Sequence, residues 1–240
     1  MLKSGAPGGT RTPGLLVRSQ SLYPPELRAH RSFIITSPLR AQEDCYHEIC
    51  TMLFHHTKRE IEIKLPLTGA EHGRGLLRSA GFRVVRKRVL EINEVYDTPR
   101  GDLKRSGILL RLRQAGRVST LTVKKPLAGS RYKSRHEVET PVSDFGACAE
   151  LLHCLGYKTA FRYEKYRTEY SKPGAKGLAM LDETPIGVFL ELEGPPSWID
   201  RTARQLGFGA RDYITLTYMD LHLKAYRSKG LLRSRMVFAR

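Results

Sequence analysis

The 240-residue chain lacks several features that would place it in a common functional class. Its four cysteines show neither a C-x-x-C pair nor the spacing of a zinc site, so we expect reduced thiols at Cys45, Cys50, Cys148 and Cys154. No apolar run reaches the length of a membrane-spanning helix, and the first residues contain no apolar signal-peptide core. We therefore expect a cytoplasmic protein without a membrane partner.

Acidic residues are scarce relative to basic ones, with 24 Asp and Glu against 41 Lys and Arg and a formal net charge of +17. Residues 1–51 contribute +2 and residues 224–240 contribute +6, which leaves +9 for residues 52–223. A basic protein tends to bind nucleic acid, an anionic surface or an anionic small molecule. The total charge does not choose among these partners.

The chain divides into three parts. Residues 1–51 show no apolar periodicity and are predicted to be a disordered leader. Within it, residues 8–23 resemble the peptide produced when a transfer-RNA gene is translated, which implies a mis-assigned start and makes Met52 the expected true start. A genuine interaction arm is the alternative. Residues 52–223 form the predicted folded domain, and residues 224–240 form a basic tail that we expect to be frayed.

Period-two alternation and β-branched residues predict eight strands in the folded domain. They cover residues 59–65, 83–97, 108–114, 118–125, 132–140, 158–170, 177–182 and 187–193. Four helices are also expected. The first is opened by a capping box of Thr68 and Glu71, and the others begin at Ser143, Ser197 and Asp212. The short connections favour antiparallel neighbours.

Charged residues repeat at alternate positions of these strands. Side chains at i and i+2 share one face of a strand, so the first strand has three charged residues opposite an isoleucine-rich face. The recurring charged positions are Glu60, Glu62, Lys64, Arg111, Arg113, Lys124, Glu137, Glu139, Lys165, Arg167, Glu169, Asp182, Glu191 and Glu193. One such strand is usually half-buried with its charges in water. Doublets of like charge on so many strands instead require opposite charges between them.

A divalent cation would neutralise the carboxylate doublets, and a polyphosphate would neutralise the arginines and lysines. The apolar faces also need cover, which four amphipathic helices can supply. We therefore predict an α+β fold: a closed antiparallel β-barrel of about eight strands, with a charged interior and helices packed outside.

The ordered set of motifs resembles the CYTH superfamily, the triphosphate tunnel metalloenzymes. The motifs are Glu60-x-Glu62-x-Lys64, Arg111-x-Arg113, Lys124, Glu137-x-Glu139, Lys165-x-Arg167, Asp182 and Glu191-x-Glu193. The resemblance covers about residues 58–223. The superfamily includes class IV adenylate cyclases, thiamine triphosphatases and inorganic triphosphatases, and its fold is an antiparallel β-tunnel.

The resemblance implies a role for each motif. The expected phosphate-binding residues are Lys64, Arg111, Arg113, Lys124, Lys165 and Arg167, with Glu137 and Glu139 as a less defined acidic pair beside the substrate. The expected ligands of a catalytic Mg²⁺ or Mn²⁺ are Asp182, Glu191 and Glu193. Glu60 and Glu62 would hold a second metal ion or, with Lys64, orient the attacking group. Arg162 is an alternative to the Lys165 and Arg167 pair if the strand register slips.

These roles predict a metal-dependent enzyme that acts on ATP, thiamine triphosphate or tripolyphosphate, as a monomer or homodimer. Hydrolysis is favoured over cyclisation to cyclic AMP, because no stretch is typical of an adenine pocket. A non-catalytic polyphosphate- or RNA-binding module is the other alternative, but converging carboxylates would repel a phosphate backbone without metal. Candidate acid–base groups are His55, His56 and His136.

Overall fold

The computed structural model describes residues 58–127, 131–227 and 235–239. The predicted leader, Met52, His55 and His56 lie outside the described residues, as do residues 228–234 of the predicted tail.

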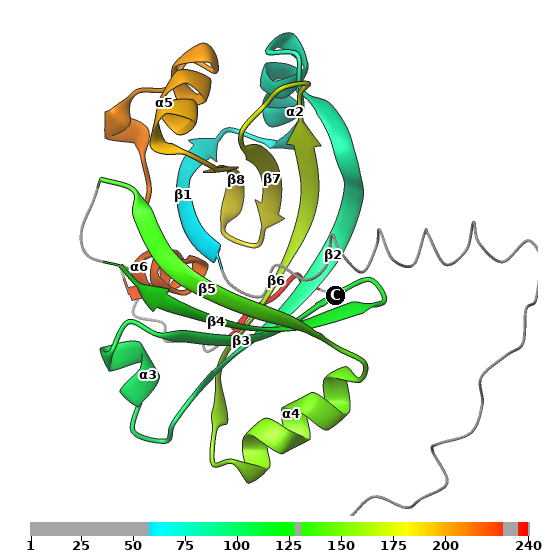
Figure 1. Cartoon of the computed structure of the whole chain (residues 1–240), viewed down its shortest axis with the longest axis vertical. Helices are drawn as coiled ribbons and strands as arrows, with labels where there is room; N and C mark the ends of the chain where they lie inside the picture. Colours follow the sequence, from blue (N-terminus) through cyan, green and yellow to red (C-terminus); the bar gives the residue numbers. More distant parts are fainter. Residues whose placement is uncertain (1–57, 128–130, 228–234, 240) are drawn as a thin grey trace, which may run out of the picture. The chain divides into compact units, whose positions relative to one another are not determined.

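Eight antiparallel strands close into a barrel (Figure 1). They are β1 (Lys58–Leu67), β2 (Arg83–Asp97), β3 (Leu109–Ala115), β4 (Val118–Pro126), β5 (Lys133–Val142), β6 (Lys158–Ser171), β7 (Leu178–Thr184) and β8 (Gly187–Glu193). The order around the ring is β2-β3-β4-β5-β1-β8-β7-β6, and pairing of β2 with β6 closes it. The predicted closed barrel is confirmed, and each predicted strand ends within two residues of the observed one.

The helices lie outside the barrel wall (Figure 1). They are α2 (Ala70–Ser79), α3 (Asp102–Arg105), α4 (Phe145–Cys154), α5 (Pro196–Gln205) and α6 (Tyr218–Arg227), with a 3-10 turn, η2, at Ala210–Asp212. The four predicted helices correspond to α2, α4, α5 and α6, and the short α3 was not predicted. No helix in the described part of the chain is long and apolar enough to span a membrane.

Two of the predicted helix caps are wrong. The capping box at Thr68 does not form, because the N-cap of α2 is Gly69 and the Thr68 hydroxyl instead lies 3.0 Å from His72 Nδ1. At α4 the cap is Asp144 rather than Ser143, and its carboxylate accepts a hydrogen bond from the backbone N–H of Ala147 at 2.8 Å.

The last two helices begin at other residues than predicted. Helix α5 starts at Pro196, where a residue without an N–H leaves no donor unsatisfied. Asp212 opens only the 3-10 turn, and α6 begins at Tyr218. There Thr217 and Asp220 exchange hydrogen bonds, from Thr217 N to Asp220 Oδ2 at 3.2 Å and from Asp220 N to Thr217 Oγ1 at 3.1 Å. This reciprocal pair satisfies N–H groups at the start of the helix.

The described end of the chain is ordered differently from the predicted frayed tail. Helix α6 continues through Arg227, and a two-residue strand, β9 (Arg235–Met236), pairs in parallel with β6. The Met236 side chain is almost fully buried, beside Phe161 and Tyr163. The burial of Met236, the ring contact of Phe238 with Tyr166 and the pairing with β6 hold this segment against the barrel.

The apolar core lies between the barrel wall and the helices. Under α2 and α5 it contains Ile63, Leu65, Leu181, Leu190 and Leu192, which are all fully buried. Under α4 it contains Leu110 and Leu112, together with Cys148 and Leu152 of the helix. Of the two cysteines of α4, Cys148 is buried in this core and Cys154 is exposed. The outward residues of each strand therefore stabilise the barrel, and the inward ones are left for another role.

Helix α2 approaches the barrel closely at Gly73, which predicts a contrast between two glycines of that helix. A Cβ at Gly73 would come within 2.7 Å of the side chains of Leu67 and Leu181, whereas a Cβ at Gly75 meets nothing within 4 Å. Gly75→Ala should stabilise by about 0.5–1 kcal/mol through helix propensity. Gly73→Ala should be less stable than Gly75→Ala by about 1–3 kcal/mol, because it overpacks the core. Urea unfolding of both variants checks this, and equal stabilities would contradict the close packing of α2.

Candidate active site

The barrel encloses a cavity of about 480 Å³, to which all eight strands contribute inward side chains. Twelve of the thirteen residues predicted for the site line it: Glu60, Glu62, Lys64, Arg111, Arg113, Lys124, Glu137, Glu139, Lys165, Arg167, Glu191 and Glu193. The thirteenth, Asp182, is fully buried next to Lys165 and Arg167. The charged residues at alternate positions of the strands therefore all lie on the inner side of one barrel.

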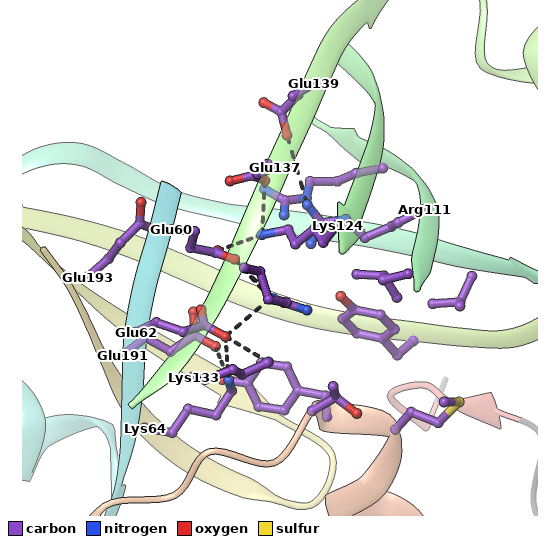
Figure 2. Close-up of a pocket in the computed structure, with 18 of the residues that line it drawn as sticks. Glu60, Glu62, Lys64, Arg111, Lys124, Lys133, Glu137, Glu139, Glu191 and Glu193 are labelled. Atoms are coloured by element: carbon purple, nitrogen blue, oxygen red, sulfur yellow. Dashed lines mark hydrogen bonds and ion pairs between the residues drawn. The ribbon is translucent and has the colours of Figure 1, made fainter. Parts of the chain in front are cut away.

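Neighbouring strands bring acids and bases together in the half of the cavity formed by β1, β4 and β5 (Figure 2). Lys124 Nζ lies 2.5 Å from Glu60 Oε1 and 2.9 Å from Glu137 Oε1. Arg135 Nη2 lies 3.0 Å from Glu60 Oε2 and 3.3 Å from Glu62 Oε1. Each of these carboxylates therefore already has a basic partner.

Sequence reasoning missed Lys133 and Arg135. Both lie on β5 and line the cavity, and Lys133 Nζ donates to Glu62 Oε1 at 2.7 Å. The signal was available, because these residues continue the alternation of Glu137 and Glu139 towards the start of the strand.

The strands β1, β8, β7 and β6 carry a second network. Lys64 Nζ lies 3.2 Å from Glu191 Oε1 and 3.3 Å from Glu62 Oε1. Arg167 donates to both Asp182 oxygens, at 2.7 and 2.6 Å, and it also pairs with Glu191. The two glutamates of β8 are therefore separated by bases, which is the arrangement that their like charges require.

The register of β6 directs Lys165 and Arg167 into the cavity. Lys165 Nζ donates to Asp182 Oδ2 at 2.8 Å. Arg162 is not in the cavity lining, and it pairs with Glu94 at 3.4 Å and with Glu164 at 3.7 Å. The alternative with Arg162 in the site does not fit this register.

Strand β2 supplies two further buried residues that sequence reasoning missed. Arg113 donates to Asn93 Oδ1 at 3.2 Å and to Glu91 Oε1 at 3.4 Å, and Glu91 Oε2 also lies 3.5 Å from Lys165 Nζ. Glu91 and Asn93 have no exposed surface and hold the bases from behind. Arg111 is held less tightly, 3.3 Å from Thr122 Oγ1 and 3.9 Å from Glu139, and its buried Nε has no hydrogen-bond partner.

Positive charge is in excess around Arg111, Arg113 and Lys165, which we call the cationic region. Burial would raise the pKa of the Tyr163 phenol at its centre, but the charges of Arg111, Lys165 and Arg113 outweigh burial and lower the pKa. Elsewhere in the cavity, burial lowers the pKa of Lys133 to about 7, and the charges of Lys64 and Arg135 lower it further, against the attraction of Glu62. An anion in the cationic region would be stabilised.

We call Glu60 and Glu193 the carboxylate region; Glu60 pairs with Lys124 and Arg135, and Glu193 pairs with Lys58. Burial raises the pKa of Glu193, and the charge of Glu60 raises it further, against the attraction of Lys58. Lys58 Nζ is 2.7 Å from Glu193 Oε1, and 43% of its side chain is exposed. This pairing at the edge of the cavity is the most accessible among the ion pairs of the predicted site.

The carboxylate region suits a hard divalent cation by its donor chemistry, since carboxylate oxygens are the ligands that Mg²⁺ and Mn²⁺ prefer. A cation there would also stabilise the ionised form of Glu193, which burial disfavours and the charge of Glu60 disfavours further. Among the described residues no three His, Cys, Asp or Glu side chains already form a metal-binding group. The bases that hold Glu60, Glu62 and Glu191 account for this.

Other candidates from the sequence have structural roles or lie elsewhere. His136 does not line the cavity. Asp97 lines the cavity, but its carboxylate accepts hydrogen bonds from the backbone N–H groups of Leu103 and Lys104 and so holds α3.

The chain matches known proteins in sequence and in fold. The family model described as the CYTH domain matches residues 58–210. A Methanocaldococcus jannaschii protein named "Putative adenylate cyclase" is 27% identical over 135 residues, which are 56% of this chain and 75% of that protein. A solved structure from Pyrococcus horikoshii is 25% identical with a TM-score of 0.58, over 68% of this chain and 98% of that one.

A second solved structure, from Vibrio parahaemolyticus, has a TM-score of 0.60 at 18% identity, over 69% of this chain and 98% of that one. At this identity the likeness concerns the fold alone, and that fold is the closed barrel described above. The match of the family model covers all eight barrel strands and every residue of the predicted site. The chain therefore belongs to the CYTH domain family.

Proposed function

We propose that this protein hydrolyses a triphosphate with the help of a divalent cation. Proteins of the CYTH family bind triphosphates such as ATP and generally depend on a divalent metal. The observation that carries the proposal is the cationic region, where the buried Arg111 and Lys165 and the partly buried Arg113 create enough positive potential to lower the pKa of a buried phenol. A chain of phosphate groups is the anion that suits several bases spread along one cavity.

The phosphates would bind first to the bases that have the weakest partners. Arg111 and Arg113 present guanidinium groups that can bind phosphate oxygens through two parallel hydrogen bonds. Lys165 lies between them and Asp182. Glu137 and Glu139 would hold Lys124 and Arg111 in place on the substrate side.

The cation would be held by carboxylates from Glu60, Glu62, Asp182, Glu191 and Glu193. A carboxylate that binds a cation forms a weaker ion pair with its lysine or arginine partner. The side chains of Lys64, Lys124 and Arg167 would then be available to bind phosphate oxygens. When bound, the cation neutralises phosphate charge and lowers the pKa of a coordinated water. The bases of this chain hold the phosphates in line for attack and stabilise the charge that develops.

Cyclisation of ATP is the second candidate. It is favoured by the name of the M. jannaschii relative and by an apolar side of the cavity at Val95, Leu109 and Met219, which leaves room for an organic group. In that reaction the ribose 3′-hydroxyl attacks the α-phosphorus and pyrophosphate leaves.

One set of incubations distinguishes hydrolysis from cyclisation. The full chain is given ATP, thiamine triphosphate and tripolyphosphate, each with Mg²⁺, with Mn²⁺ and with a chelator. Orthophosphate as the product supports hydrolysis, whereas cyclic AMP with pyrophosphate supports cyclisation. Absence of metal-dependent turnover on all three would refute the enzyme and favour a binding module.

Arg111→Ala should weaken triphosphate binding. The loss of a hydrogen bond between charged groups is worth about 1.5–3 kcal/mol, or roughly a tenfold to hundredfold rise in KM. Arg111→Lys should recover only part of the loss, because the planar fork is gone. Arg162→Ala is the matched control, since it removes a guanidinium from outside the cavity and should leave KM unchanged. Equal KM values for Arg111→Ala and Arg162→Ala would place Arg111 outside the site.

The two glutamates of β8 should respond differently to Glu→Gln when no metal is added. Burial would raise the pKa of Glu191, but Lys64 and Arg167 hold it well below its usual range, so Glu191→Gln breaks a buried pair and should destabilise by about 3 kcal/mol. The pKa of Glu193 is raised, so its ionised form disfavours the folded state at pH 7, and Glu193→Gln should be neutral or stabilising.

Added Mg²⁺ should raise the melting temperature of the wild type through binding, and should raise that of Glu193→Gln much less. Thermal melts with and without Mg²⁺ measure both effects. An unchanged Mg²⁺ response in Glu193→Gln would remove this residue from the cation site. Equal metal-free stabilities of the two variants would contradict the charge environments described for β8.

A further inference from the structure

Four residues of the cavity wall come from outside the segment that the family model matches: Thr217, Tyr218, Met219 and Asp220. The match ends at residue 210, whereas Tyr218 opens α6 and lines the cavity. Only 5% of Tyr218 is exposed. Its ring packs beside Tyr163 and Phe189, with centroid distances of 6.1 and 5.7 Å. The chain after the matched domain therefore contributes to the interior of the barrel.

Tyr218 contacts three of the residues predicted for the site. Its hydroxyl donates a hydrogen bond to Asp182 Oδ2 at 2.7 Å. Its ring lies against two ammonium groups, with Lys64 Nζ 5.1 Å and Lys165 Nζ 5.0 Å from the centroid. Both distances fall within the range of cation–π attraction.

The ring supports these cations in a way that a carboxylate does not. An acidic partner attracts a lysine but also cancels its charge, and so weakens its attraction for an anion. The face of an aromatic ring attracts the ammonium group while adding no net charge. The ring therefore helps to fix the positions of Lys64 and Lys165 without adding a negative charge beside them.

The hydroxyl acts on the same bases through Asp182. Asp182 also accepts hydrogen bonds from Lys165 and Arg167, and Tyr218 is the uncharged donor beside them. The hydrogen bond from the phenol occupies one acceptor position of the Asp182 carboxylate. Asp182 therefore interacts less strongly with Lys165 and Arg167. Burial raises the pKa of Tyr218 well above its usual range, with the charge of Asp182 acting in the same direction, so the hydroxyl remains a donor.

The start of α6 is fixed well enough to hold this arrangement. The exchange of hydrogen bonds between Thr217 and Asp220 sets the first turn. One turn later His222 is buried, with its ring 5.3 Å from that of Phe161 on β6. The Tyr218 ring is thus presented to the cavity by a helix packed on the barrel.

We propose that Tyr218 is a positioning residue of the triphosphate site: its ring holds the ammonium groups of Lys64 and Lys165 beside the phosphates, and its hydroxyl shares Asp182 with Lys165 and Arg167. This inference rests on the proposed function in so far as the anion is a triphosphate. It makes the C-terminal helix α6 part of the binding site.

The test measures binding of tripolyphosphate to the full chain by calorimetry without metal, beside kcat and KM with Mg²⁺. Tyr218→Leu removes ring and hydroxyl, and Tyr218→Phe removes the hydroxyl alone. Tyr226→Phe is the matched control, since it removes a phenol hydroxyl from the same helix at a position that does not line the cavity. Melting temperatures are recorded for all variants.

Tyr218→Leu should weaken tripolyphosphate binding about tenfold or more, because two cation–π contacts are lost. Tyr218→Phe should restore most of that affinity and remain about threefold weaker than the wild type, with the change in KM rather than in kcat. Tyr226→Phe should bind as the wild type does. Such a graded loss of affinity does not arise from a purely structural role.

Wild-type affinity in Tyr218→Leu would overturn the proposal. So would equal losses in the Leu and Phe variants, since the ring would then contribute nothing, and so would a loss of affinity that tracks the melting temperature across all three variants. The proposed function is judged separately. A wild type that binds tripolyphosphate without turnover refutes hydrolysis, while the comparison of affinities still decides the role of Tyr218.

Discussion

A charged side chain inside a barrel must face an opposite charge, and the strand register of this protein provides one. Lys64 stands directly opposite Glu191, Lys124 opposite Glu137, and Arg167 opposite Asp182 on the neighbouring strand. A slip of one residue would turn the charges towards the helices and the leucines towards the cavity. The register that closes the barrel is therefore the same register that builds the site.

The two faces of the wall contribute differently to the free energy of folding. Buried ion pairs give little net stability, because desolvation offsets much of their attraction. The outward leucines and isoleucines under α2 and α5 provide the favourable apolar burial. The barrel can thus carry an interior arranged for binding, since its stability comes mainly from the other side of the same strands.

Much of the barrel and most of the site were predictable, because alternation in a strand fixes which side chains share a face. Lys133 and Arg135 lie within the strand predicted over residues 132–140, but they were missed because only the acidic doublet of Glu137 and Glu139 was recognised in that strand. Glu91 and Asn93 were missed because their strand was predicted from its β-branched residues and not from alternating charges. The sequence around Tyr218 contains no pattern that would indicate its position in the cavity. Asp212 resembled a helix start, and only long-range packing brings α6 to the cavity.

Closure by β2 and β6 also has a consequence for the order of folding. These strands are far apart in the chain, and the segment between them contains β3, β4, β5 and α4. Their pairing requires a long loop to close, which makes it slow compared with forming the β3–β4 hairpin. Until then the acids and bases of the open sheet stay in water and need no partners. The buried charges therefore lose their contact with water only when the ring closes.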